Sequence, residues 1–216
     1  MAKETVMVFC AHPDDEVIGV GGTIAKYSKQ GKEVIAVIFS YGESSHPWMK
    51  KKFTIKMRVK ESRKAGKLLG CKKTIFLGLK DAFLSKETQN PKVKKMLENL
   101  ITKYQPKKIF THSYNDVIYK DHRSVHDTIT KLVDKMNYQA EVYTFNIWNL
   151  TNIRRRNLPK LIVDITDTFK LKVKALDLFK SQRVSLIQLM PVVYIRAFKH
   201  GFEGNCRWGE KFYKVR

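Results

Sequence analysis

Short apolar runs alternate along the chain with longer segments in which apolar positions recur at helical spacing. Two continuous, β-rich runs, Thr5 to Ala11 and Glu33 to Ser40, predict strands that are buried on both faces. Between them, Glu16 to Lys29 predicts a helix that ends at Gly31. The alternation then continues, with helices predicted over 53–69, 91–104, 121–135 and 167–181 and strands over 74–77, 108–113, 140–148 and 161–165. Residues 182–216 follow no single period and predict a helix and a covering segment.

Strands and helices that alternate at this spacing predict βαβ units, and therefore an α/β fold. The central sheet is expected to be mostly parallel, with helices on both of its faces. A length of 216 residues suits a single domain spanning 1–216, and the chain contains no internal repeat or linker. No apolar run approaches the ~20 residues that a bilayer span requires.

The composition is strongly basic, with 42 Lys and Arg against 20 Asp and Glu, which gives a formal net charge of +22. Such a charge suits nucleic acid or an anionic membrane as a partner. The alternative is a soluble protein from a lysine-rich proteome or a salty cytoplasm. We favour this alternative, because the lysines are spread along the chain and no recognised nucleic-acid motif accompanies them. Three widely spaced cysteines form no disulfide framework, so a cytoplasmic location is expected.

A histidine and three acids follow the first predicted strand directly, in the run from His12 to Glu16. Ligands in parallel α/β folds bind at such carboxyl ends of strands. His12 and Asp15 are three residues apart across a tight turn and could reach one ion, and imidazole with carboxylate suits zinc. Asp14 would then be free to act on a metal-bound water. The alternative, in which the acids only cap the next helix, explains Asp15 and Glu16 but not His12.

A second polar cluster follows the predicted strand over 108–113. A catalytic zinc site typically has three protein ligands and a water, and His122 is the natural third ligand. Asp121 or Asp116 could orient this histidine through its other ring nitrogen. His112 either faces the site or is only hydrogen-bonded at the end of its strand.

Together these residues resemble the PIG-L/LmbE family of zinc-dependent de-N-acetylases. The opening signature of that family is matched in full by Ala11-His12-Pro13-Asp14-Asp15-Glu16, which Gly19 and Gly21-Gly22 follow. Later segments resemble further family patterns in the same order: Arg58-x-x-Glu61-x-x-x-Ala65 with Leu69-Gly70, Phe76-Leu77-Gly78 with Asp81, Thr111-His112-Ser113, Asp121-His122-Arg123, Lys174-Ala175-Leu176 with Ser181-Gln182, and Glu210 with Phe212.

The resemblance implies a Rossmann-like three-layer fold and one zinc ion held by His12, Asp15 and His122, with Fe²⁺ or another divalent ion as an alternative metal. It also implies that Asp14 is the general base. The implied reaction removes the N-acetyl group of an N-acetylglucosamine-type sugar conjugate and releases acetate.

The resemblance further suggests that Arg58 and Asp81 contact the sugar, although a solvated helix charge and a turn residue are the alternatives. The chain departs from the family at two positions. Tyr119 stands where the family usually has a histidine that assists catalysis, and Phe179 stands where many relatives carry histidine. Tyr119 or His112 could donate a hydrogen bond to the oxyanion that forms during hydrolysis.

The expected partner is a small sugar or glycolipid substrate, and no specific nucleic acid is expected. Contact with an anionic membrane surface and assembly into a homo-oligomer, which relatives often show, are compatible with the sequence. Two rival functions remain at this point. One is an amidase that acts on another amide conjugate, and the other is a catalytically retired basic protein that binds nucleic acid or anionic lipid.

Overall fold

A seven-stranded sheet forms the centre of the protein in a computed structural model, which describes residues 3–116, 120–148 and 158–216. The strand order is β3-β2-β1-β4-β5-β7-β6. The strands are β1 (Thr5–Cys10), β2 (Glu33–Ser40), β3 (Lys73–Leu79), β4 (Lys108–His112), β5 (Glu141–Phe145), β6 (Lys160–Asp164) and β7 (Gly209–Lys214).

The sheet is parallel from β3 to β5, while β7 pairs antiparallel with both β5 and β6. The predicted α/β fold with a mostly parallel sheet is therefore confirmed. From β1 the chain first builds the sheet outward through β2 and β3, and then returns to place β4 on the other side of β1. The carboxyl ends of β1 and β4 thus form the topological switch point, where open α/β sheets bind their ligands.

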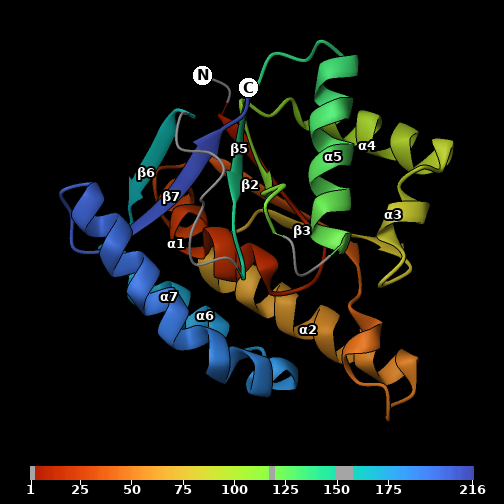
Figure 1. Cartoon of the computed structure of the whole chain (residues 1–216), viewed down its shortest axis with the longest axis horizontal. Coiled ribbons are helices and arrows are strands. Elements are labelled where there is room, and N and C mark those ends of the chain that lie inside the picture. The colour runs from red at the N-terminus through yellow and green to blue at the C-terminus, as the bar shows by residue number, and fades with distance from the viewer. Residues whose placement is uncertain (1–2, 117–119, 149–157) are drawn as a thin grey trace.

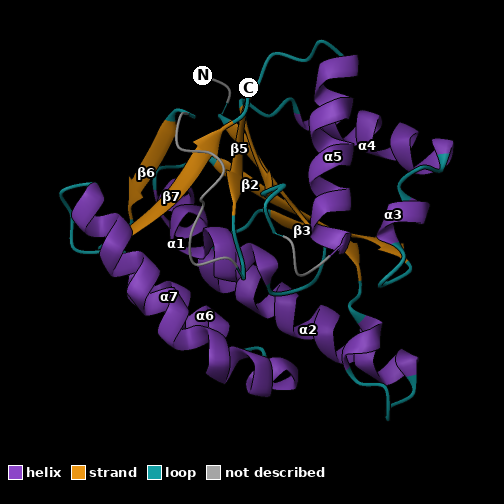
Figure 2. Ribbon diagram, in the orientation of Figure 1, coloured by secondary structure: helices purple, strands orange, loops and turns teal. Residues whose placement is uncertain are grey.

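Helices cover both faces of the sheet (Figures 1 and 2). One layer contains α1 (Asp15–Lys29), α2 (Lys51–Leu69), α6 (Phe169–Leu176) and α7 (Arg183–Glu203), and the other contains α3 (Leu84–Glu87), α4 (Pro91–Tyr104) and α5 (Lys120–Lys135). Side chains of β1 alternate between the two cores, because successive residues of a strand point to opposite faces. Val6, Val8 and Cys10 pack under the first layer, while Met7 and Phe9 pack under the second.

Several elements differ from the sequence-based expectation. The helix predicted over 167–181 is shorter, because α6 ends at Leu176 and only a 3₁₀ turn, η2 (Lys180–Gln182), follows before α7. The segment between the predicted strand over 33–40 and the predicted helix over 53–69 contains another 3₁₀ turn, η1 (Glu43–Ser45), and the first residues of α2. The short helix α3 was not predicted. No helix among the described residues is both long enough and apolar enough to cross a membrane.

A buried ion pair fixes α1 to the C-terminal part of the chain. Lys172 Nζ lies 2.7 Å from Glu210 Oε1 and donates to the carbonyl oxygen of Ile18 at 2.7 Å. Glu210 also accepts from the backbone N–H groups of Gly22 and Thr23, at 2.9 and 2.8 Å. A regular helix would join the Ile18 carbonyl to the Gly22 N–H. The ion pair therefore bonds to the backbone of α1 itself and secures the helix that begins with Asp15.

Candidate metal centre

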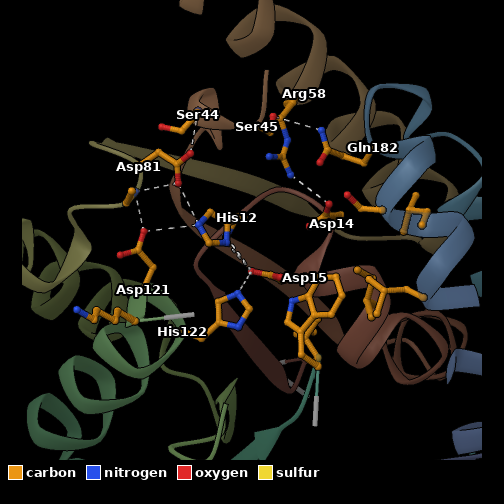
Figure 3. Close-up of a pocket in the computed structure, with 18 residues that line it drawn as sticks. His12, Asp14, Asp15, Ser44, Ser45, Arg58, Asp81, Asp121, His122 and Gln182 are labelled. Atoms are coloured by element: carbon orange, nitrogen blue, oxygen red, sulfur yellow. Dashed lines mark hydrogen bonds and ion pairs between the residues drawn. The ribbon is translucent and has the colours of Figure 1, made fainter. Parts of the chain in front are cut away.

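A cavity of about 570 Å³ opens at the carboxyl ends of the parallel strands (Figure 3). Its walls come from the loop after β1, from η1, α2 and α5, and from α7. The side chains that line it include His12, Asp14, Asp15, Ser44, Ser45, Arg58, Asp81, Asp121, His122, Trp148, Gln182, Ser185, Leu186 and Leu189. Most residues predicted from the sequence to form the site therefore share one cavity.

His12, Asp15 and His122 present three ligand atoms that lie within 4.8 Å of one another. Asp15 Oδ2 is 3.5 Å from His12 Nδ1 and 3.5 Å from His122 Nε2. In a tetrahedral zinc site, with ligand bonds of about 2.1 Å, neighbouring ligand atoms are separated by roughly 3.4 Å. The spacing of these donors therefore fits a tetrahedral metal site.

Each of the two histidines has a carboxylate beside its other ring nitrogen. His12 Nε2 lies 3.0 Å from Asp81 Oδ1, and His122 Nδ1 lies 2.8 Å from Asp116 Oδ2. Metal-binding histidines usually donate their second N–H to such a partner, which fixes the tautomer and leaves the first nitrogen free for the ion. Of the two acids that the sequence left open as the partner of His122, the structure places Asp116 in this position.

Asp121 lies beside the same ring nitrogen of His12 as Asp81, with its Oδ2 3.6 Å from Nε2. It also accepts backbone hydrogen bonds from Ala82 at 2.8 Å and from Leu84 at 3.2 Å, and so holds the turn that carries Asp81. Two further groups of acids and histidines could hold a metal, His12 with Asp81 and Asp121, and His112 with Asp116 and His122. Among the three groups found in the described residues, the set around Asp15 alone combines both His12 and His122 while Asp81 and Asp116 remain beside their other ring nitrogens, which favours that set.

His112 is fully buried and stacks on His122 at a ring-centroid distance of 4.0 Å. Its Nε2 accepts from the Ala11 backbone N–H at 3.0 Å and lies 3.2 Å from Asp15 Oδ2. Burial, together with the charge of His122, lowers the pKa of His112 to about 4, so this imidazole is neutral near pH 7. It packs behind the candidate ligands Asp15 and His122 and connects them to the end of β1.

Asp14 has a backbone conformation that is unusual for a residue with a side chain, with φ at 122°. Its N–H donates to Glu16 Oε2 at 2.9 Å, and Glu16 Oε1 in turn accepts from Ser62 Oγ at 2.7 Å. The Asp14 side chain makes no capping bond to α1, although it occupies the N-cap position. Strained backbone of this kind is concentrated at functional sites. Helix capping therefore does not explain Asp14, whose carboxylate points into the cavity (Figure 3).

Arg58 is only 4% exposed and holds the loop that carries Asp14. Its Nη2 lies 3.1 Å from Asp14 Oδ2 and donates to the Pro13 carbonyl at 2.6 Å, and its Nη1 donates to the Gly42 carbonyl at 3.0 Å. A Cβ at Gly42 would lie 2.1 Å from Nη1, so the close approach requires glycine. The alternative of a solvated helix charge is thus wrong for Arg58.

The electrostatics of the cluster favour a bound cation. Burial lowers the pKa of His12, but hydrogen bonds with Asp121, Asp15 and Asp81 outweigh it and leave the pKa well above its usual value. Burial likewise raises the pKa of Asp15, yet His122 and His112 hold it well below its usual range. Burial also raises the pKa of Asp14 to about 6, against the opposing effect of Arg58. The cluster thus places one anionic carboxylate, Asp15, between two imidazoles, and beside it a second carboxylate, Asp14, whose pKa of about 6 suits proton exchange near neutral pH.

Sequence reasoning missed part of the cavity wall. The cavity wall also includes Trp148 and Leu186, which come from segments without a chemical motif, and Gln182. Gln182 belongs to a family pattern, but that pattern alone did not indicate that it lines the cavity. Tyr119, the predicted oxyanion donor, lies outside the described residues. The fold and the site together define an α/β protein with a histidine–aspartate cluster suited to a divalent metal at its switch point.

Comparison with known proteins agrees with this class. The family model described as "GlcNAc-PI de-N-acetylase" matches residues 7–133, which is more than half of the chain. A "probable N-acetyl-alpha-D-glucosaminyl L-malate deacetylase 2" of Bacillus cereus is 26% identical over 195 residues, which cover 87% of each chain. The N,N'-diacetylchitobiose deacetylase of Pyrococcus horikoshii superimposes with a TM-score of 0.81 and 26% identity, over 98% of this chain and 84% of that one.

The chain therefore belongs to the PIG-L family of deacetylases, and the resemblance noted in the sequence is confirmed. The fold alone does not select the reaction. A 4-carboxy-2-hydroxymuconate hydratase of Pseudomonas putida superimposes with a TM-score of 0.82 and 21% identity, over 99% of this chain and 96% of that one.

Proposed function

We propose that the protein is a metal-dependent de-N-acetylase that hydrolyses the acetamido group of an N-acetylglucosamine-type sugar conjugate. The observation that carries this proposal is the position of Asp14 beside the group formed by His12, Asp15 and His122. Zinc is the metal that such a set of two imidazoles and one carboxylate suits best. A divalent ion bound there would polarise the amide carbonyl and acidify a water molecule.

The residues around the metal position have separate tasks in this mechanism. Asp14 accepts a proton from the attacking water as the new C–O bond forms, and a pKa near neutrality suits that role. The C–N bond then breaks, and protonated Asp14 returns the proton to the leaving amine. Acetate and a free amino sugar are the products. Arg58 fixes the orientation of Asp14 through a contact of 3.1 Å between Nη2 and the Asp14 carboxylate.

The cavity suits a sugar because it combines polar groups with an aromatic wall. Ser45 and Gln182 supply hydrogen-bonding groups, and Trp148 adds an indole face. Asp81 lines the same wall. Its carboxylate accepts from the Ser44 N–H at 2.9 Å and lies beside His12, so we propose that it orients His12 and meets the sugar at the cavity edge.

The first experiment measures the metal content of the purified protein beside that of His12→Ala and His122→Ala. About one zinc ion per wild-type chain, lost in both variants, would support the proposed ligand set. Asp14→Asn should keep the metal and lose most of the acetate release from N-acetylglucosamine conjugates. Acetate release near the wild-type rate in Asp14→Asn would exclude Asp14 as the base, and a wild-type chain that binds no metal would refute the proposed function.

A further inference from the structure

The outer face of α7 is apolar and exposed. Val184, Ile187, Ile195, Phe198 and Phe202 follow one side of this helix, with exposed fractions between 59% and 80%. The inner side is apolar as well and packs in the core through Leu186, Leu189, Val193 and Ala197. No charged residue occurs between Val184 and Ile195. A helix that is apolar on its outer side as well as on its inner side normally has a covering partner for that outer side.

The outer face of the neighbouring helix α2 is cationic. Lys52, Lys56, Lys60 and Lys64 recur at every fourth residue, so they form one line along the helix, and all are exposed. The one acid of this helix, Glu61, is buried and accepts hydrogen bonds from Ser181. The outer face of α2 therefore presents positive charge without an anion of its own to balance it.

The two helices belong to the same layer on one side of the sheet, with α6 between them (Figure 1). An aromatic and basic segment lies at the start of α2, where Trp48 is 79% exposed and Phe53 follows three exposed lysines. Both helices also contribute to the wall of the cavity, through Arg58 of α2 and Leu186 of α7. Exposed apolar, aromatic and cationic side chains thus lie on, or next to, helices that also contribute to the cavity wall.

We propose that this side of the molecule docks on the surface of an anionic lipid bilayer. The α2–α7 face, as we call it, consists of Lys52, Lys56, Lys60 and Lys64 together with the exposed apolar side chains of α7. Lysines attract anionic headgroups, and an apolar helix lying in the plane of the interface buries its outer face among acyl chains. Interfacial tryptophan, as at Trp48, is a further property of such surfaces.

Two other partners, a second copy of the chain and nucleic acid, fit the α2–α7 face less well than an anionic bilayer does. A second copy of the chain would bring another net charge of +22 against the first, which opposes association. Nucleic acid would satisfy the lysines of α2 but would leave the apolar face of α7 exposed to water. The anionic bilayer complements both parts of the surface, and this proposal does not depend on the reaction that the cavity catalyses.

The test is co-sedimentation of the full chain with phosphatidylcholine vesicles, with and without phosphatidylglycerol. We expect binding only to the anionic vesicles, with weaker binding as salt is added. The triple variant Lys56→Glu/Lys60→Glu/Lys64→Glu should bind at least about 100-fold more weakly, because each lysine near an anionic surface contributes roughly a fivefold factor. A control with the same change of charge, Lys92→Glu/Lys103→Glu/Lys131→Glu, lies on α4 and α5 in the opposite layer and should retain most of the binding.

The contribution of α7 is tested with Ile187→Gln/Ile195→Gln/Phe202→Gln, which should weaken vesicle binding about tenfold or more. Quenching of tryptophan fluorescence by brominated lipid in the anionic vesicles gives a second measurement on the wild-type chain, and it decides the matter if this variant does not fold. Absence of binding or of quenching in the wild type would refute the proposal, as would equal losses in the two lysine variants. A wild-type oligomer that becomes monomeric in the α7 variant while vesicle binding is unchanged would assign this face to a second copy of the chain and overturn the proposal.

Discussion

Replacement of Asp116 by asparagine tests the metal site without touching a proposed ligand. Asp116 is fully buried, and its Oδ2 lies 2.8 Å from His122 Nδ1. The carboxylate keeps the proton on Nδ1, so that Nε2, 3.5 Å from Asp15 Oδ2, presents its lone pair to the ion. Asparagine retains an acceptor of the same shape but removes the negative charge that makes the imidazole more basic. We therefore expect Asp116→Asn to bind zinc more weakly while His122 stays in place.

The size of this effect follows from the contact. Loss of a partner behind a metal ligand typically weakens metal affinity about 10–100-fold, which corresponds to about 1.4–2.8 kcal/mol. A buried hydrogen bond to a charged group is worth about 1.5–3 kcal/mol, so the two estimates agree. Zinc affinity is measured by competition with a chromophoric chelator, with Asp177→Asn, an exposed position after α6, as the control. If Asp116→Asn bound zinc as tightly as the control while His122→Ala lost it, the role assigned to Asp116 would be wrong.

Three further predictions concern the free energy of unfolding of the metal-free protein, measured with urea. Burial raises the pKa of Glu16 to about 7, whereas an unfolded glutamate loses its proton near pH ~4.3. Stability should therefore fall as the pH rises through this window, and Glu16→Gln should reduce that fall and leave the part that comes from Asp14, whose pKa is raised to about 6; an unchanged pH dependence would contradict the reasoning. Lys172→Met leaves Glu210 buried without its cation and should cost about 3–5 kcal/mol, and a loss near zero would argue against the ion pair. Gly22→Ala places a Cβ 2.7–2.9 Å from three atoms of Ile165 and should cost about 1–3 kcal/mol, while a neutral result would show that α1 can shift.

The hydrophobic pattern of the sequence predicts the strands of the parallel part of the sheet, but it predicts the strands of the C-terminal part less well. The strands β1 and β2 are mostly apolar runs buried on both faces, which is the pattern that parallel sheets impose, and β4 is buried as well although it carries Thr111 and His112. The late strand β7 contains Glu210 and Lys211 among its residues, so its hydrophobic pattern is interrupted. Its place between β5 and β6 depends on long-range pairing and on the buried contact of Glu210 with Lys172, which a local pattern does not contain.

The sequence predicts the part of the candidate site whose residues are brought together by the order of the strands. His12 and Asp15 follow β1 and His122 follows β4, and these strands are neighbours, so the fold itself brings the residues together. The sequence does not decide whether Asp116 or Asp121 lies beside the Nδ1 atom of His122. Both lie within six residues of His122, and the direction of each side chain depends on the path of the loop before α5 and on the turn at Ala82, which Asp121 holds.

Helix α2 shows how one helical period can serve two purposes. Arg58 and Ser62 are four residues apart and face inward, where they hold Asp14 directly and through Glu16. Lys56, Lys60 and Lys64 are spaced by the same interval but are displaced by two residues, which places them on the opposite side of the helix, about 200° around its axis. Substitutions on the lysine line therefore change the charge of the surface without altering the contacts that position Asp14. The vesicle-binding variants should accordingly retain their zinc affinity, and a variant that loses both would show that the two sides of α2 are coupled.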